Sequence, residues 1–300
     1  MSSEEFAALD SRFGIPGVAR VVAGNGGLPK VAVSSPVAEG EMYLHGGHVT
    51  SWTPQGATDV LYGSPNTSWQ DGRAIRGGVP ICFPWFGDNA HNPSARAHGF
   101  VRTKAWQLDS IESNDNEVEV AMSTENGDDT RQWWPFDFHL TCRATFGAQF
   151  KIELIVANTG TSPFIFEEAL HAYFRVGDVQ TATIRGLDAT RFIDKVDDFT
   201  EKPQTGDLRL SAETDRIYLN TTHEIEIADL VLNRRLTIAK ENSLTTVVWN
   251  PWAEKSATIA DLGAGEWQRF VCIETSNVGA FAVRLSPGES HTMTVRVNCG

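Results

Sequence analysis

Apolar and polar residues alternate along several short segments, and this pattern constrains the fold of the chain more than any other feature. At 117–122, 150–156 and 293–297 every second residue is apolar. Because successive side chains of a β-strand point to opposite faces, each segment predicts a strand with one buried face. Turn sequences rich in glycine, proline and asparagine lie between such runs, as at 25–27, 158–160 and 286–288.

These segments indicate the fold class. No long amphipathic helix alternates with the strands, so a parallel α/β sheet is disfavoured and a large antiparallel β-sandwich, an all-β fold, is expected. A chain of 300 residues fits one such domain, and we expect it to cover residues 16–300 after a loosely attached leader at 1–15. The apolar run 79–86 contains Pro80 and Pro84, which cannot donate ladder hydrogen bonds, so it predicts an irregular or edge segment.

The charge of the chain limits its partners. The formal net charge is −13 and no run of Lys or Arg is present, which argues against binding to nucleic acid or to an anionic membrane surface. The acidic N-terminal segment lacks the features of a secretion signal, and no segment approaches the roughly 18 apolar residues of a membrane span. We therefore expect a cytoplasmic protein. An anionic small molecule would need a local cluster of arginines to overcome the net charge.

The cysteine and histidine spacing predicts no metal site and no cofactor. No CxxC pair occurs, so free thiols are expected at Cys82, Cys142, Cys272 and Cys299. His45 and His48 would point to opposite faces of a strand, which disfavours shared chelation. The glycine run at 24–27 lacks the full GxGxxG pattern of a dinucleotide site.

Two residues are candidates for acid–base chemistry. His171 lies in an aromatic, strand-like run, where a histidine serves either as a hydrogen-bonded core residue or as a catalyst. Glu274 ends the apolar run 270–273, and a buried carboxylate without a partner costs several kcal/mol, so it needs a partner or a function. Its alternative interpretation is a structural ion pair with an arginine.

Arg76 and Arg102 are candidates for binding an anion, because the planar guanidinium group binds phosphate through two hydrogen bonds. The pair Gly77-Gly78 follows Arg76 and would let the backbone approach a ligand closely. The alternative is a surface arginine beside a flexible turn, and the residues alone barely favour the ligand.

Several ordered blocks resemble the glucose-6-phosphate 1-epimerases, the hexose-6-phosphate mutarotases of the aldose 1-epimerase superfamily. The resemblance extends from about Leu44 to the last strand near Val297, and its blocks are 76–80, 83–87, 98–102, 170–174, 214–218, 248–252 and 272–274. It implies a galactose-mutarotase-like β-sandwich that binds a sugar in a cleft on one sheet, with His171 as general acid and Glu274 as general base.

The resemblance also implies substrate contacts, with Arg76, Arg102 and Asp215 matching family positions and His98 facing the sugar. The chain departs from some relatives at Ala97, where they carry a polar side chain, and this leaves one sugar or phosphate contact in doubt. No role is assigned to three further cations, Arg73, Arg96 and Lys255. The expected partner is a sugar phosphate, and the expected state is a monomer.

The chemistry fits these residue types, because a cyclic hemiacetal opens when the C1 hydroxyl loses a proton while the ring oxygen gains one. We therefore expect interconversion of the α and β anomers of a hexose 6-phosphate. One alternative is a mutarotase for unphosphorylated aldoses, which would not need two arginines for an anion. Another is a non-catalytic sugar-binding or sensor protein, which could lose the acid–base pair.

Overall fold

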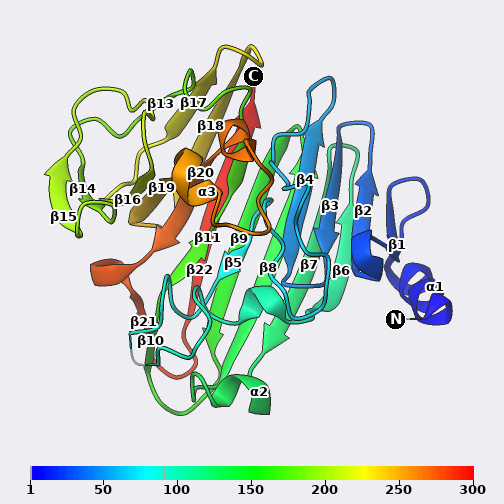
Figure 1. Ribbon diagram of the computed structural model, residues 1–300. Helices are drawn as coiled ribbons and strands as arrows, with labels where there is room; N and C mark the ends of the chain where they lie inside the picture. The colour runs from blue at the N-terminus through cyan, green and yellow to red at the C-terminus, as the bar shows by residue number, and fades with distance from the viewer. Residues whose placement is uncertain (1, 91) are drawn as a thin grey trace.

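Two layers of antiparallel strands form the molecule, with the polypeptide crossing between them many times (Figure 1). The structure is a computed structural model that describes residues 2–90 and 92–300. The paired strands within its sheets all run antiparallel. The expected all-β sandwich is thereby confirmed.

The first layer is one eight-stranded sheet that contains all three segments of strict alternation. They form parts of β7, β9 and β22, so the three strand predictions are confirmed. In sheet order the strands are β13 (Thr183–Arg185), β17 (Ile225–Asp229), β18 (Arg234–Glu241), β22 (Ser290–Cys299), β9 (Gln149–Asn158), β8 (Phe138–Gly147), β7 (Glu117–Glu125) and β6 (Gln107–Ser113).

The second layer contains another eight-stranded sheet and, beside it, a four-stranded sheet. The larger sheet comprises β15 (Thr200–Pro203), β14 (Arg191–Asp194), β16 (Thr214–Leu219), β19 (Thr245–Asn250), β20 (Phe270–Asn277), β11 (Glu168–Leu170) and β5 (Ile81–Cys82), with β12 (Tyr173–Arg175) also paired to β20. The smaller comprises β1 (Ala19–Ala23), β2 (Pro29–Ser34), β3 (Ala38–Tyr43) and β4 (His48–Pro54).

Short elements complete the described chain. A separate ladder joins β10 (Phe164–Phe166) to β21 (Val283–Leu285). The α-helices are α1 (Ser3–Phe13), α2 (Asp128–Arg131) and α3 (Trp252–Ser256), and the 3₁₀ turns are η1 (Asn25–Gly27), η2 (Val101–Thr103), η3 (Glu266–Arg269) and η4 (Gly279–Phe281). Within residues 2–90 and 92–300, no helix has the length and apolar content needed to cross a bilayer.

The N-terminal segment, expected as a loosely attached leader, makes specific contacts. Helix α1 begins with a capping box at Ser2. Asp10 accepts hydrogen bonds from the Arg20 side chain at 2.9 Å and from the Val21 N–H at 2.8 Å, and Phe13 packs against the core. These contacts hold α1 against β1, at the edge of the four-stranded sheet (Figure 1).

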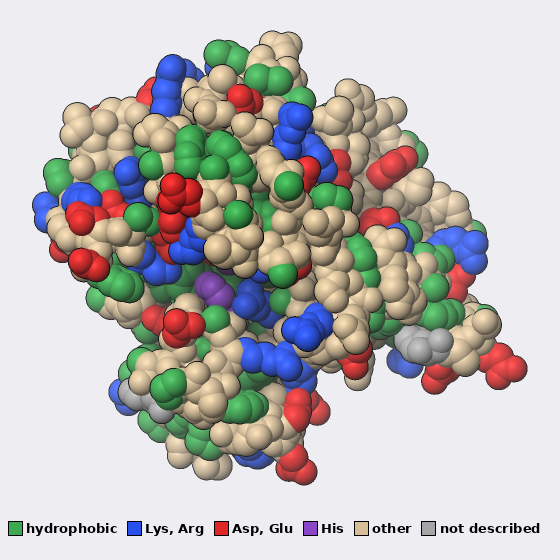
Figure 2. Space-filling view, in the orientation of Figure 1, with side chains coloured by type: hydrophobic (Ala, Val, Ile, Leu, Met, Phe, Trp, Pro, Cys, Tyr) green, Lys and Arg blue, Asp and Glu red, His purple; other side chains and the backbone are tan. Residues whose placement is uncertain are grey.

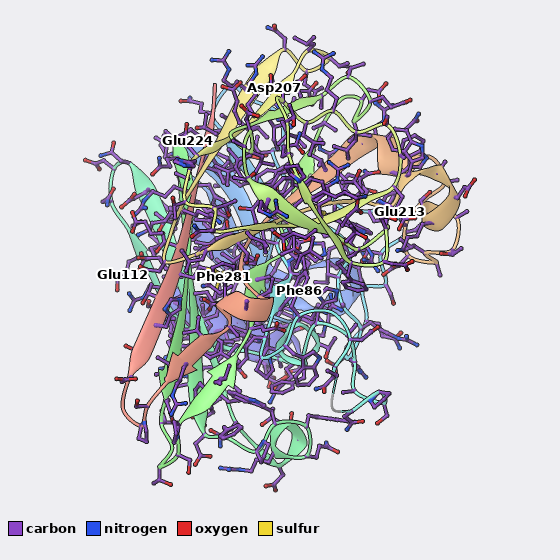
Figure 3. The ribbon with its side chains drawn as sticks, turned by 90° about the vertical axis from the view of Figure 1, so that its left-hand side faces the viewer. Phe86, Glu112, Asp207, Glu213, Glu224 and Phe281 are labelled. Carbon is purple, nitrogen blue, oxygen red and sulfur yellow. The ribbon has the colours of Figure 1, made fainter. Side chains whose placement is uncertain are left out.

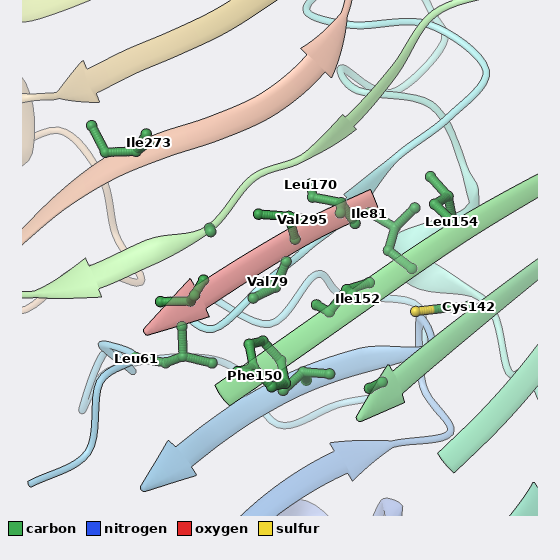
Figure 4. Packing of buried hydrophobic residues seen from close by; sticks show 14 of the residues in the cluster. Leu61, Val79, Ile81, Cys142, Phe150, Ile152, Leu154, Leu170, Ile273 and Val295 are labelled. Atoms are coloured by element: carbon green, nitrogen blue, oxygen red, sulfur yellow. The ribbon is translucent and has the colours of Figure 1, made fainter. Parts of the chain in front are cut away.

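The core lies between the layers, where apolar side chains from both sides interdigitate (Figure 4). Ile152 and Val295 of the first layer face Leu170 and Ile273 of the second in one buried cluster. Each fully buried aliphatic side chain contributes about 1.5–3 kcal/mol. Because this packing fixes the strands of the second layer from behind, it also fixes the side chains on their outer face.

The side chains of β20 alternate between the core and the outer face of the second layer, and this alternation places Glu274. Val271 and Ile273 point into the core between the layers, whereas Phe270 and Cys272 belong to a second apolar cluster on the opposite face. By the same alternation Glu274 lies on this outer face. All eight residues of β20 are buried, so the outer face is covered as well.

The run 79–86 forms only the two-residue strand β5, at the end of its sheet, as the prolines predicted. Its backbone supports the neighbouring segments, since the Pro80 carbonyl accepts the His171 N–H at 2.9 Å and the Pro84 carbonyl accepts the Glu167 N–H at 2.9 Å. Residues 171–172 separate β11 from β12 and belong to neither strand. His171 therefore lies in a break of the ladder beside β20.

Candidate active site

A hollow opens on the outer face of the second layer, with a histidine at its floor and Lys and Arg side chains on its rim (Figure 2). The strand register accounts for the residues gathered on this face. Asp215 of β16 pairs with Trp249 of β19, which in turn pairs with Cys272 of β20. Glu274 lies two residues further along β20, so its side chain points to the same side as these three.

His171 and Glu274 meet in this site. The His171 Nε2 lies 3.3 Å from the Glu274 Oε1, and the two residues are only 7% and 1% exposed. The imidazole ring stacks on Tyr173, with 4.9 Å between ring centroids, and meets the edges of Trp249 at 5.8 Å and His98 at 5.7 Å. Aromatic packing thus holds the histidine against the carboxyl group.

The partner of Glu274 decides between its two interpretations. Among the described residues no arginine or lysine lies within ion-pair distance of Glu274, and its Oε2 has no hydrogen-bond partner. A structural ion pair with an arginine is therefore not what the described residues form. A buried polar atom left unsatisfied costs about 1–3 kcal/mol.

Burial shifts both members of the pair toward their uncharged forms. It raises the pKa of Glu274 well above its usual range; the charge of Asp215 adds to this effect, while Lys195 and Arg102 oppose it. Burial lowers the pKa of His171 well below its usual range, with further lowering by the charges of Arg102 and Arg76. The free site therefore favours a protonated Glu274 beside a neutral His171.

Arg76 reaches the site but has partners of its own. Its Nε and NH2 lie 3.0 Å from the Asp261 Oδ1, and its NH1 donates to the Tyr173 hydroxyl at 3.1 Å. Sequence reasoning did not find Asp261, which lies in a loop with no motif. Since Tyr173 stacks on His171, this network links Arg76 to the imidazole ring.

Arg102 and His98 come from one short segment around η2. Arg102 donates to the Ala97 carbonyl at 2.9 Å, and among the described residues no carboxylate lies within ion-pair distance of it. His98 adopts a left-handed backbone conformation, with φ of 64°, and its Nδ1 accepts the Gly87 N–H at 3.3 Å. Burial, reinforced by the charge of Arg102, lowers the pKa of His98 well below its usual range.

Asp215 forms a salt bridge that the sequence did not suggest. Its Oδ2 lies 2.9 Å from the Nζ of Lys195, which follows β14. The same ammonium lies 5.8 Å from the ring centroid of Phe86, and Phe86 meets the edge of His98 with 4.8 Å between centroids. Lys195 therefore lies beside Phe86, which is labelled in Figure 3.

The pair Gly77-Gly78 serves the fold, and the idea that it admits a ligand is not supported. Gly78 has φ of 60°, and a Cβ there would lie 2.2 Å from the Val49 carbonyl oxygen. A Cβ on Gly77, at φ of 108°, would lie 2.4 Å from the Tyr62 carbonyl oxygen. Neighbouring backbone, which does not move aside, occupies the space that the missing side chains leave.

The three cations without an assigned role lie on the surface. Lys255 forms a salt bridge with Glu213 at 2.7 Å, Arg96 donates to the Gly72 carbonyl at 2.6 Å, and Arg73 is exposed. None of them contacts the acid–base pair in the described interactions.

The remaining histidine and cysteine candidates for metal binding are His45, His48 and the four cysteines. The Nε2 atoms of His45 and His48 contact the carbonyls of Arg73 and Gly77. Cys299 is half-buried, and the other three thiols are buried and free. In the described part of the chain, no group of three or more His, Cys, Asp or Glu side chains could hold a metal ion.

Open pockets also lie elsewhere on the described surface. One of about 490 Å³ is lined by residues of β17 and β18, and one of about 260 Å³ is lined by Gly99 and Arg96 among others. Neither is lined by His171 or Glu274, so the pair is identified by its chemistry.

Known proteins are similar to this chain in sequence and architecture. A family model described as aldose 1-epimerase matches residues 31–298. A Salmonella typhimurium protein named "Putative glucose-6-phosphate 1-epimerase" is 37% identical over 249 residues, which cover 83% of this chain and 83% of that protein. The crystal structure of a "putative mutarotase" from Salmonella typhimurium superposes with a TM-score of 0.90 at 32% identity, covering 96% of this chain and 95% of that one.

A more distant likeness concerns the fold alone. A galactose mutarotase related enzyme from Lactobacillus acidophilus superposes with a TM-score of 0.71 at 13% identity, covering 90% of this chain and 97% of that one. The expected galactose-mutarotase-like sandwich is confirmed. Because the family model spans most of the chain and the Salmonella relative matches 83% of it, this chain belongs to the aldose 1-epimerase family of sugar isomerases.

Proposed function

We propose that this mutarotase interconverts the α and β anomers of glucose 6-phosphate or a closely related hexose 6-phosphate. The observation that carries the proposal is the buried contact between His171 Nε2 and Glu274 Oε1, with Arg102 and Arg76 near enough for their charges to lower the pKa of His171. The name of the Salmonella relative supports the choice of a phosphorylated sugar.

The proposed chemistry needs one proton to leave and one to arrive. Glu274 takes the proton of the C1 hydroxyl while His171 gives a proton to the ring oxygen, so the C1–O5 bond breaks and an aldehyde forms. Rotation about the bond between C1 and C2 presents the other face, and the reverse transfers close the ring. Each proton relay contributes about 10²–10⁴ in rate.

Burial of the pair suits this cycle. Before ring opening the pair is charged, as a carboxylate and an imidazolium; after it, both groups are neutral. Because burial favours the neutral forms of both Glu274 and His171, it stabilises the ring-opened complex relative to the closed one. Forming the charged pair therefore costs free energy. The charges of the surrounding cations and of Asp215 change this cost.

The basic rim supports an anionic substrate. The chain carries a net charge of −13, so a sugar phosphate must be attracted locally. Arg102 has a guanidinium without a carboxylate partner among the described residues, and Arg76 lies on the same face. A mutarotase for neutral aldoses would not need these charges.

Magnetisation-transfer NMR tests the proposal directly. Exchange between the two anomeric protons is measured for glucose 6-phosphate and for free glucose, at equal concentrations, with and without the protein. We expect clear acceleration with glucose 6-phosphate and a smaller effect with glucose. A preference for glucose would favour an unphosphorylated aldose as substrate, and no acceleration of either sugar would favour a non-catalytic sugar-binding protein.

A further inference from the structure

Three cations, Arg76, Arg102 and Lys195, lie near His171, and each has different partners in the free protein. Arg76 faces Asp261 with two of its nitrogens and donates to Tyr173 with the third. Its charge is therefore balanced and its hydrogen-bonding groups are engaged. Arg102, in contrast, donates one hydrogen bond to a backbone carbonyl and has no carboxylate partner among the described residues.

A phosphate monoester needs more than Arg102 alone. The group carries about −1.5 to −2 charges at neutral pH and offers three acceptor oxygens. A single guanidinium leaves part of this charge unbalanced in a site where burial weakens solvation. A second cation that can change partners is required, and Arg76 can do so only by leaving Asp261 and Tyr173.

Lys195 has the properties of this second cation. Its backbone N–H is fixed by the Asp215 carbonyl at 2.9 Å, so the hairpin between β14 and β15 holds it beside β16. Its side chain is 25% exposed while that of Asp215 is 14% exposed, so the lysine is the more accessible member of the salt bridge. An ammonium on a flexible stem moves between acceptors more readily than a guanidinium engaged on two sides.

The surroundings place Lys195 within electrostatic reach of the reacting groups. Its Nζ lies over Phe86, whose ring contacts His98, and the ring of His98 contacts His171. The charge of Lys195 contributes to the pKa shifts of His98, His171 and Glu274 alike.

We propose that Lys195 is a specificity residue for the anionic group of the substrate, held by Asp215 in the free protein and transferred to the phosphate on binding. This inference rests on the proposed function. The transfer frees the Asp215 carboxylate to accept hydrogen bonds from sugar hydroxyls. Binding of the phosphate and of the sugar ring are thereby coupled through one salt bridge.

The test uses variants with opposite expected effects on the affinity for inorganic phosphate, measured by calorimetry on the full chain. Lys195→Gln should weaken phosphate binding about ten- to a hundredfold, the range of one charge-assisted contact, and Lys195→Arg should restore most of it. Asp215→Asn should tighten phosphate binding, because it releases Lys195. Lys202→Gln is the matched control, since Lys202 pairs with Asp194 and Asp197 in the same hairpin.

Kinetics on the same variants separate binding from support of the fold. Lys195→Gln should lower kcat/KM for glucose 6-phosphate mainly through KM, and by far more than for free glucose. Equal losses with both sugars, together with unchanged phosphate affinity, would show that Lys195 only positions Asp215 and would overturn the proposal. If the wild type binds phosphate through Lys195 but accelerates neither sugar, the proposed function fails while the anion site stands.

Discussion

Replacing Glu274 by glutamine should abolish most of the activity without loss of stability. The amide keeps the shape of the side chain but cannot take a proton, so anomer exchange should fall by about 10²–10⁴. This corresponds to about 2.7–5.4 kcal/mol of transition-state stabilisation. Because folding raises the pKa of Glu274 above its ordinary value of 4.5, its burial costs stability at any pH above that value. At pH 7 Glu274→Gln should therefore unfold at the wild-type temperature or above it.

A second buried Glu–His pair provides the control. Glu168 is fully buried, its Oε1 lies 2.9 Å from the His291 Nε2, and it accepts a hydrogen bond from Asn277 at 2.8 Å. Glu168→Gln should lower the melting temperature and keep the exchange rate, the opposite of the result for Glu274→Gln. Both variants are assayed by magnetisation-transfer NMR and thermal unfolding, with His171→Asn expected to lose activity like Glu274→Gln. A folded Glu274→Gln protein with near wild-type exchange would refute the assignment.

Three further results are expected. Arg102→Ala should lower kcat/KM for glucose 6-phosphate about ten- to a hundredfold more than for glucose, because a charge-assisted contact contributes about 1.5–3 kcal/mol; equal losses would exclude a phosphate-specific role. Gly99→Ala, with φ of 73° and a Cβ only 1.8 Å from a carbonyl oxygen, should lower urea stability more than Gly56→Ala, with φ of 78° and open space. Burial lowers the pKa of His291, but the hydrogen bond and charge of Glu168 raise it, so that overall the pKa lies above 6.5. The stability lost in His291→Gln should therefore be greatest below pH 6.5 and should shrink as pH rises. A loss independent of pH would contradict this.

Local sequence patterns predicted the strands and singled out His171 and Glu274 as candidates, because both depend on neighbouring residues. The assignment of these two residues as acid and base came from the family resemblance. Alternation fixes which face of a strand is buried, so β7, β9 and β22 could be located without any partner. The carboxylate at the end of the apolar run 270–273 could be singled out for the same reason, since its parity places it on the outer face. The prolines of 79–86 likewise limited that run to an edge.

The partners of these residues depend on register and loop closure, which no local pattern encodes. Asp261 lies 185 residues from Arg76 in sequence, and Lys195 reaches Asp215 only because β14 pairs with β16. The same limitation explains why Gly77-Gly78 suggested a ligand: the backbone that fills their space comes from β4 and from the segment that follows it. The contacts of Asp10 with β1 could not be predicted for the same reason.

A crystal structure of the protein with glucose 6-phosphate bound would test the central claim most directly. The account predicts the C1 hydroxyl and the ring oxygen within about 2.6–3.2 Å of Glu274 and His171, in reach of proton transfer. It also predicts the phosphate in contact with Arg102. A sugar bound with its phosphate over His171 and Glu274, or in another cavity, would contradict it.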